Sequence, residues 1–115
     1  MSVKYQCGRI LLESAGLTRD VPFTDGSTST VELKWTEIKR VLAFKRDLFA
    51  YDLVSVEFQT STMAIEADEQ MEGWDEMITA LPGCLPGTPE PQEWWNKVVN
   101  PAFESNVTQL FPPVT

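Results

Sequence analysis

The sequence contains no histidine, so the side chain that most often acts as a general base or a metal ligand is absent. This excludes Ser-His and Cys-His catalytic pairs within the chain. None of the six glycines belongs to a phosphate-binding pattern such as GxGxxG or GxxxxGKS/T, which argues against a nucleotide cofactor. We therefore predict no enzymatic activity, no cofactor and no bound metal ion.

Cysteines and long apolar runs are also scarce. Cys7 and Cys84 belong to no CxxC pair, so we predict two reduced thiols, with a disulfide between them as the alternative. The longest apolar runs, such as 48–51, are far below the roughly 20 residues that a bilayer span requires. The first nine residues lack the apolar region of a secretion signal. We expect no membrane span and a cytoplasmic protein.

Basic residues are missing from half of the chain. Residues 47–96 contain no Lys or Arg but carry eleven carboxylates, whereas residues 1–46 hold eight of the nine basic residues against five acids. The net charges are +3 for 1–46, −11 for 47–96 and zero for the remainder, which sums to −8. Such a charge separation bears on partners rather than on fold. A domain at −8 repels phosphates, so we predict no nucleic-acid binding.

The patterning predicts a single α+β domain over 1–115, with strands over about 8–67. The Asp25-Gly26 pair favours a tight turn, and apolar and polar residues alternate over 30–35. Two β-rich runs, 53–58 and 63–67, flank a polar turn at 59–62. The segment 36–51 fits either a strand or a helix, and we favour a strand because a meander follows it. We expect a curved antiparallel sheet or small barrel followed by two C-terminal helices.

The two helices are predicted over about 68–81 and 89–99. The first has an apolar stripe, with Asp68 as N-cap and Pro82-Gly83 as its end. The stripe consists of Met71, Trp74, Met77, Ile78 and Leu81. The second helix is expected to start near Pro89 with Thr88 as cap and to leave one of Trp94 and Trp95 partly exposed. The tail, 100–115, is predicted to be irregular.

The run Trp35-Thr36-Glu37-Ile38-Lys39-Arg40-Val41 resembles a motif of small bacterial pleckstrin-homology-like proteins. The resemblance covers about residues 8–81. It implies a bent β-sandwich or barrel whose open end is plugged by a C-terminal helix. It also implies a scaffold that binds lipid, peptide or protein, without settling which.

The acidic half supplies the first candidate site. We predict a non-enzymatic protein-binding protein, in its most specific version an immunity or inhibitor protein that occludes a basic partner such as a nuclease toxin. The predicted partner-binding residues are Glu69, Glu72, Asp75 and Glu76, with Trp95 as an anchor. A simple solvated helix face is the alternative for these acids. Asp68, Glu72 and Glu76 would share one face of the predicted helix, but their spacing is not that of a calcium loop.

The basic cluster supplies the alternative site. Lys39, Arg40, Lys45 and Arg46 lie close to Trp35 and Phe44 in sequence, as expected for a pleckstrin-homology-like module that binds a peptide or a lipid headgroup. The competing interpretation is that these residues pair with the protein's own acids. Self-association into a homodimer stays open at this stage.

Overall fold

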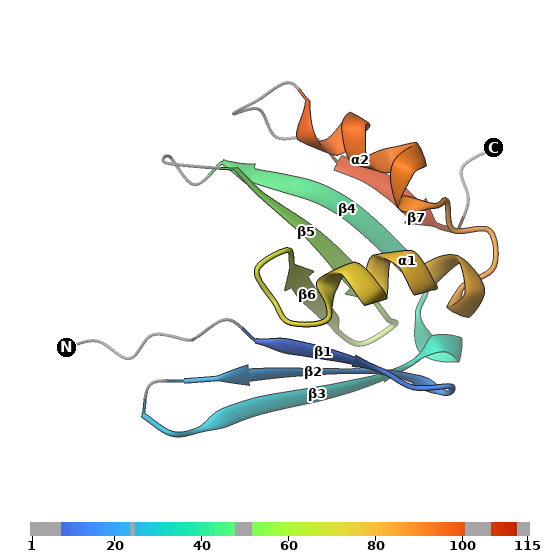
Figure 1. The fold of residues 1–115 in the computed structure, drawn as a ribbon. Coiled ribbons are helices and arrows are strands. Elements are labelled where there is room, and N and C mark those ends of the chain that lie inside the picture. Colours follow the sequence, from blue (N-terminus) through green and yellow to red (C-terminus); the bar gives the residue numbers. More distant parts are fainter. Residues whose placement is uncertain (1–7, 24, 48–51, 101–106, 113–115) are drawn as a thin grey trace.

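The chain forms two antiparallel sheets and two helices (Figure 1). The computed structural model describes residues 8–23, 25–47, 52–100 and 107–112. The first sheet has the order β1-β2-β3, and the second has the order β6-β5-β4-β7. The strands are β1 (Arg9–Leu12), β2 (Gly16–Pro22), β3 (Thr28–Lys34), β4 (Arg40–Asp47), β5 (Asp52–Gln59), β6 (Ala64–Asp68) and β7 (Val107–Phe111); the helices are α1 (Trp74–Cys84) and α2 (Pro91–Val99).

Tight turns shape the three-stranded sheet. Backbone hydrogen bonds in both directions between Glu13 and Gly16 close a two-residue loop between β1 and β2. A Cβ on Gly16 would lie 1.9 Å from the carbonyl oxygen of Leu33, so β2 and β3 can approach this closely only at a glycine. The β2–β3 turn contains Gly26 at φ +92°, which confirms the turn predicted from Asp25-Gly26.

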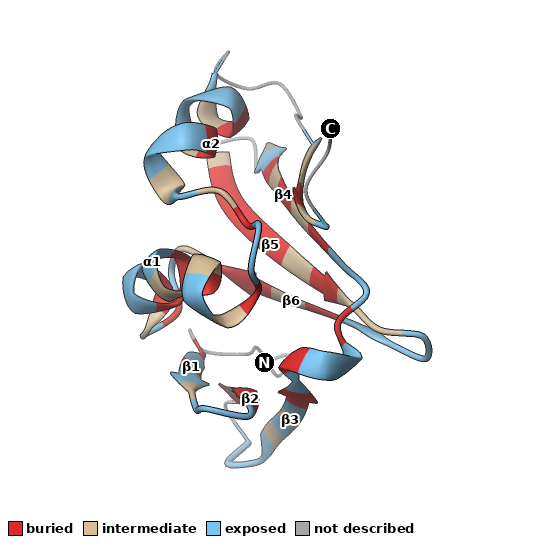
Figure 2. Ribbon diagram, turned by 90° about the vertical axis from the view of Figure 1, so that its right-hand side faces the viewer, coloured by how far each residue is buried: buried red, intermediate tan, exposed pale blue. Residues whose placement is uncertain are grey.

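The four-stranded sheet has one face turned toward the helices. Val54, Val56 and Phe58 of β5 lie on this face, and their partners on β4 are Lys45, Ala43 and Val41. Both α1 and α2 lie on the same side of the sheet (Figure 2). One cluster of buried apolar residues runs from Ile10 of β1 to Leu110 of β7 and includes the predicted helix stripe. The α+β class is therefore confirmed, whereas the alternative of a closed barrel is not, because the sheet does not close.

A short 3₁₀ helix, η1 (Trp35–Glu37), joins the two sheets. Of the ambiguous segment 36–51, residues 36 and 37 belong to η1 rather than to a strand, residues 40–47 form a strand as predicted, and residues 48–51 lie outside the described part of the chain. The predicted meander of β4, β5 and β6 is confirmed by their antiparallel registers. A backbone hydrogen bond from Thr60 to Met63 closes the predicted polar turn.

The start of the first helix was predicted wrongly. α1 begins at Trp74 with Gly73 as its N-cap, and Asp68 is the last residue of β6 rather than a cap. Asp68, Glu72 and Glu76 therefore do not share a helix face. At the other end the helix continues through Pro82 to Cys84, because a proline in the last turn removes only one intrahelical hydrogen bond.

The second helix starts two residues later than predicted. Glu90, not Thr88, is its N-cap, Pro91 occupies the first helical position, and the Glu90 amide donates to Glu93 Oε2 at 2.6 Å. The prediction of an irregular tail was wrong for 107–111, which form β7 beside β4. The helices are thus followed by one more strand, and the pleckstrin-homology-like resemblance stays a prediction.

Candidate functional site

The four predicted acids line one hollow at the start of α1. This hollow, called the acidic hollow below, has a volume of about 300 Å³. It is lined by Glu69, Met71, Glu72, Gly73, Trp74, Asp75 and Glu76. The structure therefore brings Glu69, Glu72, Asp75 and Glu76 together, although only two of them lie on the helix.

Hydrogen bonds to both sheets hold the turn that carries these acids. The Glu69 amide donates to the carbonyl oxygen of Val54 at 3.0 Å, and the Val54 amide donates to Glu69 Oε1 at 2.9 Å. On the other side, the Ile10 amide donates to Glu72 O at 2.7 Å and the Glu72 amide donates to Gly8 O at 2.9 Å. The turn is thus fixed to β5 at one end and to β1 at the other.

Gly73 makes the contact with β1 possible. Its φ is +90°, and a Cβ at this position would lie 2.2 Å from the carbonyl oxygen of Ile10. Any other residue would combine an unfavourable backbone conformation with a collision against β1. Gly73 therefore determines where α1 starts. It also determines how closely the turn over 69–73, called the acidic turn below, approaches the first sheet.

The acids differ in their freedom to meet a partner. Glu72, Asp75 and Glu76 are exposed, whereas Glu69 is half-buried and one of its oxygens already accepts the Val54 amide. Among the residues that the structure describes, none of the four forms an ion pair. Asp75 and Glu76 lie in the first turn of α1, where the positive end of the helix dipole stabilises carboxylates.

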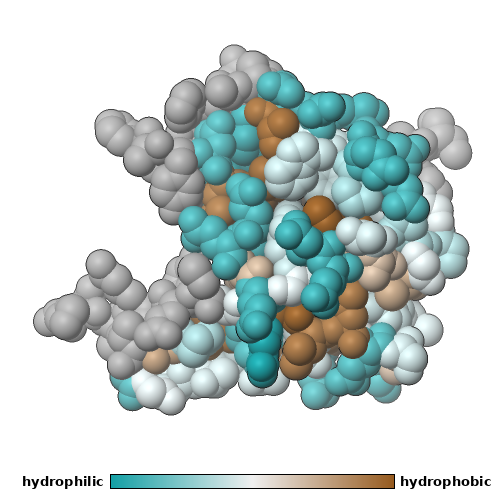
Figure 3. Space-filling model, in the orientation of Figure 1, coloured by the Kyte–Doolittle hydropathy of each residue, from teal (hydrophilic) through white to brown (hydrophobic). Residues whose placement is uncertain are grey.

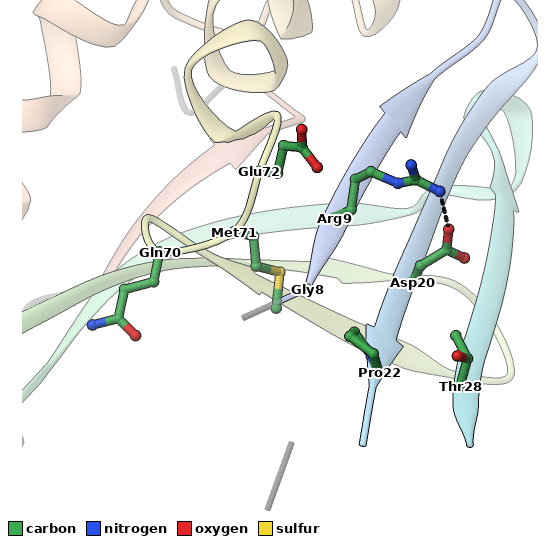
Figure 4. Close-up of a pocket in the computed structure, with 8 residues that line it drawn as sticks. All are labelled: Gly8, Arg9, Asp20, Pro22, Thr28, Gln70, Met71 and Glu72. Carbon is green, nitrogen blue, oxygen red and sulfur yellow. Dashed lines mark hydrogen bonds and ion pairs between the residues drawn. The ribbon is translucent and has the colours of Figure 1, made fainter. Parts of the chain in front are cut away.

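A second hollow of about 510 Å³ adjoins the acidic hollow and shares Met71 and Glu72 with it. Figure 4 shows Arg9 between Glu72 and Asp20, with its guanidinium turned toward Asp20. Arg9 Nη2 and Asp20 Oδ2 are 3.1 Å apart, and this hydrogen bond holds the pKa of Asp20 below its usual value. Arg9 therefore pairs with Asp20 of its own sheet and not with Glu72. The Glu72 carboxylate has no ion-pair partner among the described residues.

Trp95 is not part of the acidic hollow. It lies on α2, which packs on β4, β5 and β7, whereas the hollow lies at the start of α1 beside β1. The side chain is half-buried against the core, and its ring centroid is 5.8 Å from that of buried Trp94. One Trp of the pair is partly exposed, as predicted, but the structure does not place this Trp with the four acids.

The four basic residues of the alternative site do not share one surface. Lys45 is 2% exposed on the helix-facing side of β4, where its Nζ donates to Val99 O at 2.9 Å and lies 3.5 Å from Asp52. Arg46 points to the opposite face, where it is paired with Glu66 at 2.6 Å. Strand alternation separates these two neighbours. Lys39 is exposed, and Arg40 donates to Gln59 at 2.7 Å.

On the face shown in Figure 3, hydrophilic residues are interspersed with hydrophobic ones. Three large apolar side chains are exposed among the described residues, Leu11, Met63 and Val107, and they belong to three different strands or turns. No group of three acidic or cysteine side chains in the described ranges has a geometry that could hold a metal ion. Cys84 is a free, half-buried thiol whose pKa is raised by burial, and Cys7 lies outside the described residues.

Comparison with known proteins found no matching family model, no matching curated protein and no matching solved structure. None of the described helices combines the length and the apolar character that a membrane span needs.

The sequence did not reveal the positions of two polar residues in the fold, since Lys45 was predicted to belong to an exposed ligand-binding cluster and Arg19 was assigned no role. One is Lys45, which alternation within β4 places on the same face as buried Val41 and Ala43. The other is Arg19 of β2, whose Nη1 donates to the carbonyl oxygen of Glu66 at 2.8 Å and so links the two sheets. The strand period could have indicated the burial of Lys45, but no local signal relates Arg19 to β6.

Proposed function

We propose that this chain is a non-enzymatic binding protein that recognises a basic protein partner through the acidic hollow. The observation that supports the proposal best is the convergence of four carboxylates, none ion-paired within the described chain, on one hollow. An immunity or inhibitor protein is the most specific form of this function. Its partner would present a positive surface of its own, as a nuclease that holds nucleic acid does.

Electrostatic attraction of this kind acts mainly on the rate of association. Exposed charges at the edge of an interface raise the association rate at low salt, and screening removes this effect over about 10 Å at 0.1 M ionic strength. Glu72, Asp75 and Glu76 are the exposed members of the set and are expected to contribute most of the effect. Glu69 has a structural role as well, because it accepts the Val54 amide.

The test uses three matched baits: the wild-type chain, a triple variant and a control. The triple variant is Glu72→Gln/Asp75→Asn/Glu76→Gln. The control is Glu13→Gln/Glu32→Gln/Glu37→Gln, which removes the same charge from exposed acids of the N-terminal half. Each bait is used to capture partners from lysate of the source cell at low and then moderate salt, and the captured proteins are identified and quantified by mass spectrometry.

We expect a stoichiometric basic protein on the wild-type and control baits, depleted about tenfold or more on the triple variant. The association rate of the purified pair should fall by a similar factor and lose most of its salt dependence. The free energy of unfolding should drop by less than about 2 kcal/mol, because each first-turn carboxylate contributes roughly 0.3–1 kcal/mol. Equal capture by the triple variant and the control, or a captured partner without basic character, would rule out the proposal.

A further inference from the structure

A third hollow, of about 280 Å³, lies between β2 and the edge strand β6 and shares Met71 with the two hollows described above. Its walls combine apolar and charged side chains, and Figure 2 shows β6 as the strand of its sheet nearest to β1–β3. The lining includes Arg19, Val21, Phe23, Glu66, Asp68 and Met71. The volume lies just below the usual range of about 300–1,000 Å³ for small-molecule pockets, so the hollow suits a ligand of fragment size. None of the four acids of the acidic hollow lines it.

Arg19 has a donor in this hollow that is not satisfied. Its Nη1 donates to Glu66 O at 2.8 Å, but its Nε is buried and has no hydrogen-bond partner among the described residues. Buried donors are almost always paired in folded proteins, with protein groups, water or a ligand. The donors of Arg19, which lines the hollow, are therefore not all satisfied by the described residues.

Asp68, in contrast to Arg19, offers an acceptor that can take a donor from an occupant of the hollow. Its side chain is buried, with the whole residue 6% exposed, and Oδ1 accepts the Gln70 amide at 2.9 Å. Although Asp68 and Arg19 line the same hollow, they form no ion pair with each other or with any other residue in the described ranges. Burial raises the pKa of Asp68. Its second oxygen can accept a further hydrogen bond from a donor in the hollow.

The two requirements together restrict the chemistry of an occupant. A carboxylate would accept from Arg19 but would be repelled by Asp68, since the other acid of the hollow, Glu66, is neutralised by Arg46; an ammonium group would be repelled by Arg19. A neutral carboxamide carries an acceptor and a donor in one planar group. Val21, Phe23 and Met71 add apolar wall for an aromatic or aliphatic body.

We propose that this hollow binds a small neutral ligand with an amide-type head group. Its carbonyl accepts from Arg19 and its N–H donates to Asp68, while its apolar part packs on Phe23 and Met71. The site shares Met71 with the acidic hollow but none of its four acids, and it does not depend on the proposed partner.

Three probes with one ring and different head groups test the proposal: benzamide, benzoate and benzylamine. Each is titrated into the full-length ¹⁵N-labelled chain while backbone amide shifts are recorded. Benzamide should give saturable shifts at residues 19–23 and 66–71, with a dissociation constant on the order of millimolar, as fits a fragment of this size. Benzoate and benzylamine should bind at least about tenfold more weakly.

Two variants and a control keep the test decisive. Arg19→Met should abolish benzamide binding. Asp68→Asn retains an acceptor for the Gln70 amide and should reduce the preference for benzamide over benzoate at least fivefold, because it removes a repelling charge. Arg40→Met, at the exposed end of β4, should change nothing.

The triple variant of the acidic hollow should bind benzamide like the wild type, so this site and the proposed function can fail separately. The proposal is overturned by any one of three results: no saturable shift at these residues, equal affinity for the three probes, or an unchanged preference in Asp68→Asn.

Discussion

Replacing Lys45 tests the most unusual feature of the core, a buried ammonium group under α2. Its side chain is 1% exposed, Nζ donates to Val99 O at 2.9 Å, and Asp52 Oδ2 lies 3.5 Å away. At this distance two unit charges attract by roughly 5 kcal/mol at an effective dielectric constant of about 20, and desolvation offsets much of this. The net contribution of the pair is therefore small, but the cost of breaking it is not.

Lys45→Met keeps the length of the stem and removes the charge. Breaking a buried pair by deleting one partner costs about 3–5 kcal/mol, because the other charge is left buried. The Asp52 side chain is 18% exposed and retains some hydration, so we expect a loss of about 2–3 kcal/mol in the free energy of unfolding. The melting temperature should fall by roughly 8–12 °C.

Urea denaturation followed by Trp fluorescence measures this change, and Lys39→Met serves as the exposed control. The control should stay within about 0.5 kcal/mol of wild type. The double variant Lys45→Met/Asp52→Asn should recover about 1 kcal/mol or more, since neither charge then remains unpaired. If Lys45→Met is as stable as the control and shows no coupling to Asp52, the assignment of Lys45 as a buried, charge-paired residue is wrong.

Two further stability predictions concern the acidic turn and Asp68. Gly73→Ala should lower the free energy of unfolding by about 3 kcal/mol, because it adds left-handed backbone strain and a collision with Ile10. Gly83→Ala is the control and should be neutral or stabilising, because there is open space around a Cβ at this position. Equal effects of the two substitutions would refute the reasoning. Burial raises the pKa of Asp68 in the fold above its unfolded value near 3.8, so its charge costs stability at neutral pH and the cost disappears below that value. Asp68→Asn should therefore be more stable than wild type at pH 7 in urea titrations, and the difference should shrink as the pH falls through the raised pKa of Asp68 toward 3.8 and be absent below it; a difference that is constant from pH 3 to 7 would contradict this.

Local signals were sufficient for much of the fold. The turn at Gly26, the alternation of β3 and the meander from β4 to β6 all depend on residues that are neighbours in sequence. The apolar stripe of α1 was likewise predictable, since helix periodicity is a local property. All five residues of the predicted stripe are buried.

Long-range contacts account for the errors. The start of α1 depends on Gly73 meeting Ile10, which is far away in sequence and gives no local sign. β7 has only five residues and is stabilised by pairing with β4, some sixty residues earlier, so its own pattern was too short to identify it. A short segment of this kind becomes a strand only through its neighbour.

The acidic part of the candidate site was predictable because its residues are close in sequence. Its four acids lie within eight residues, so any compact turn brings them near one another. Trp95 was assigned as an anchor because Trp is enriched at interface hot spots, and the separate packing of α2 keeps it away from the four acids. The basic cluster was assigned from proximity in sequence, and strand alternation keeps its residues from forming one surface. The four acids, which lie on a turn and the first turn of α1, therefore share a site, whereas the basic residues along β4 do not.

The hydrogen bonds of the acidic turn bear on how it could bind. Because Glu69 is fixed to β5 and Glu72 to β1, the backbone that carries the carboxylates is ordered before any partner arrives. A partner then does not have to supply the free energy of ordering this turn. Charge neutralisation and release of the turn should therefore have different kinetic effects: the triple variant should mainly slow association, whereas Gly73→Ala, which frees the backbone and keeps the charges, should mainly speed dissociation. If both variants changed only the association rate, the turn would be acting through its charge alone, and its preorganisation would have no part in recognition.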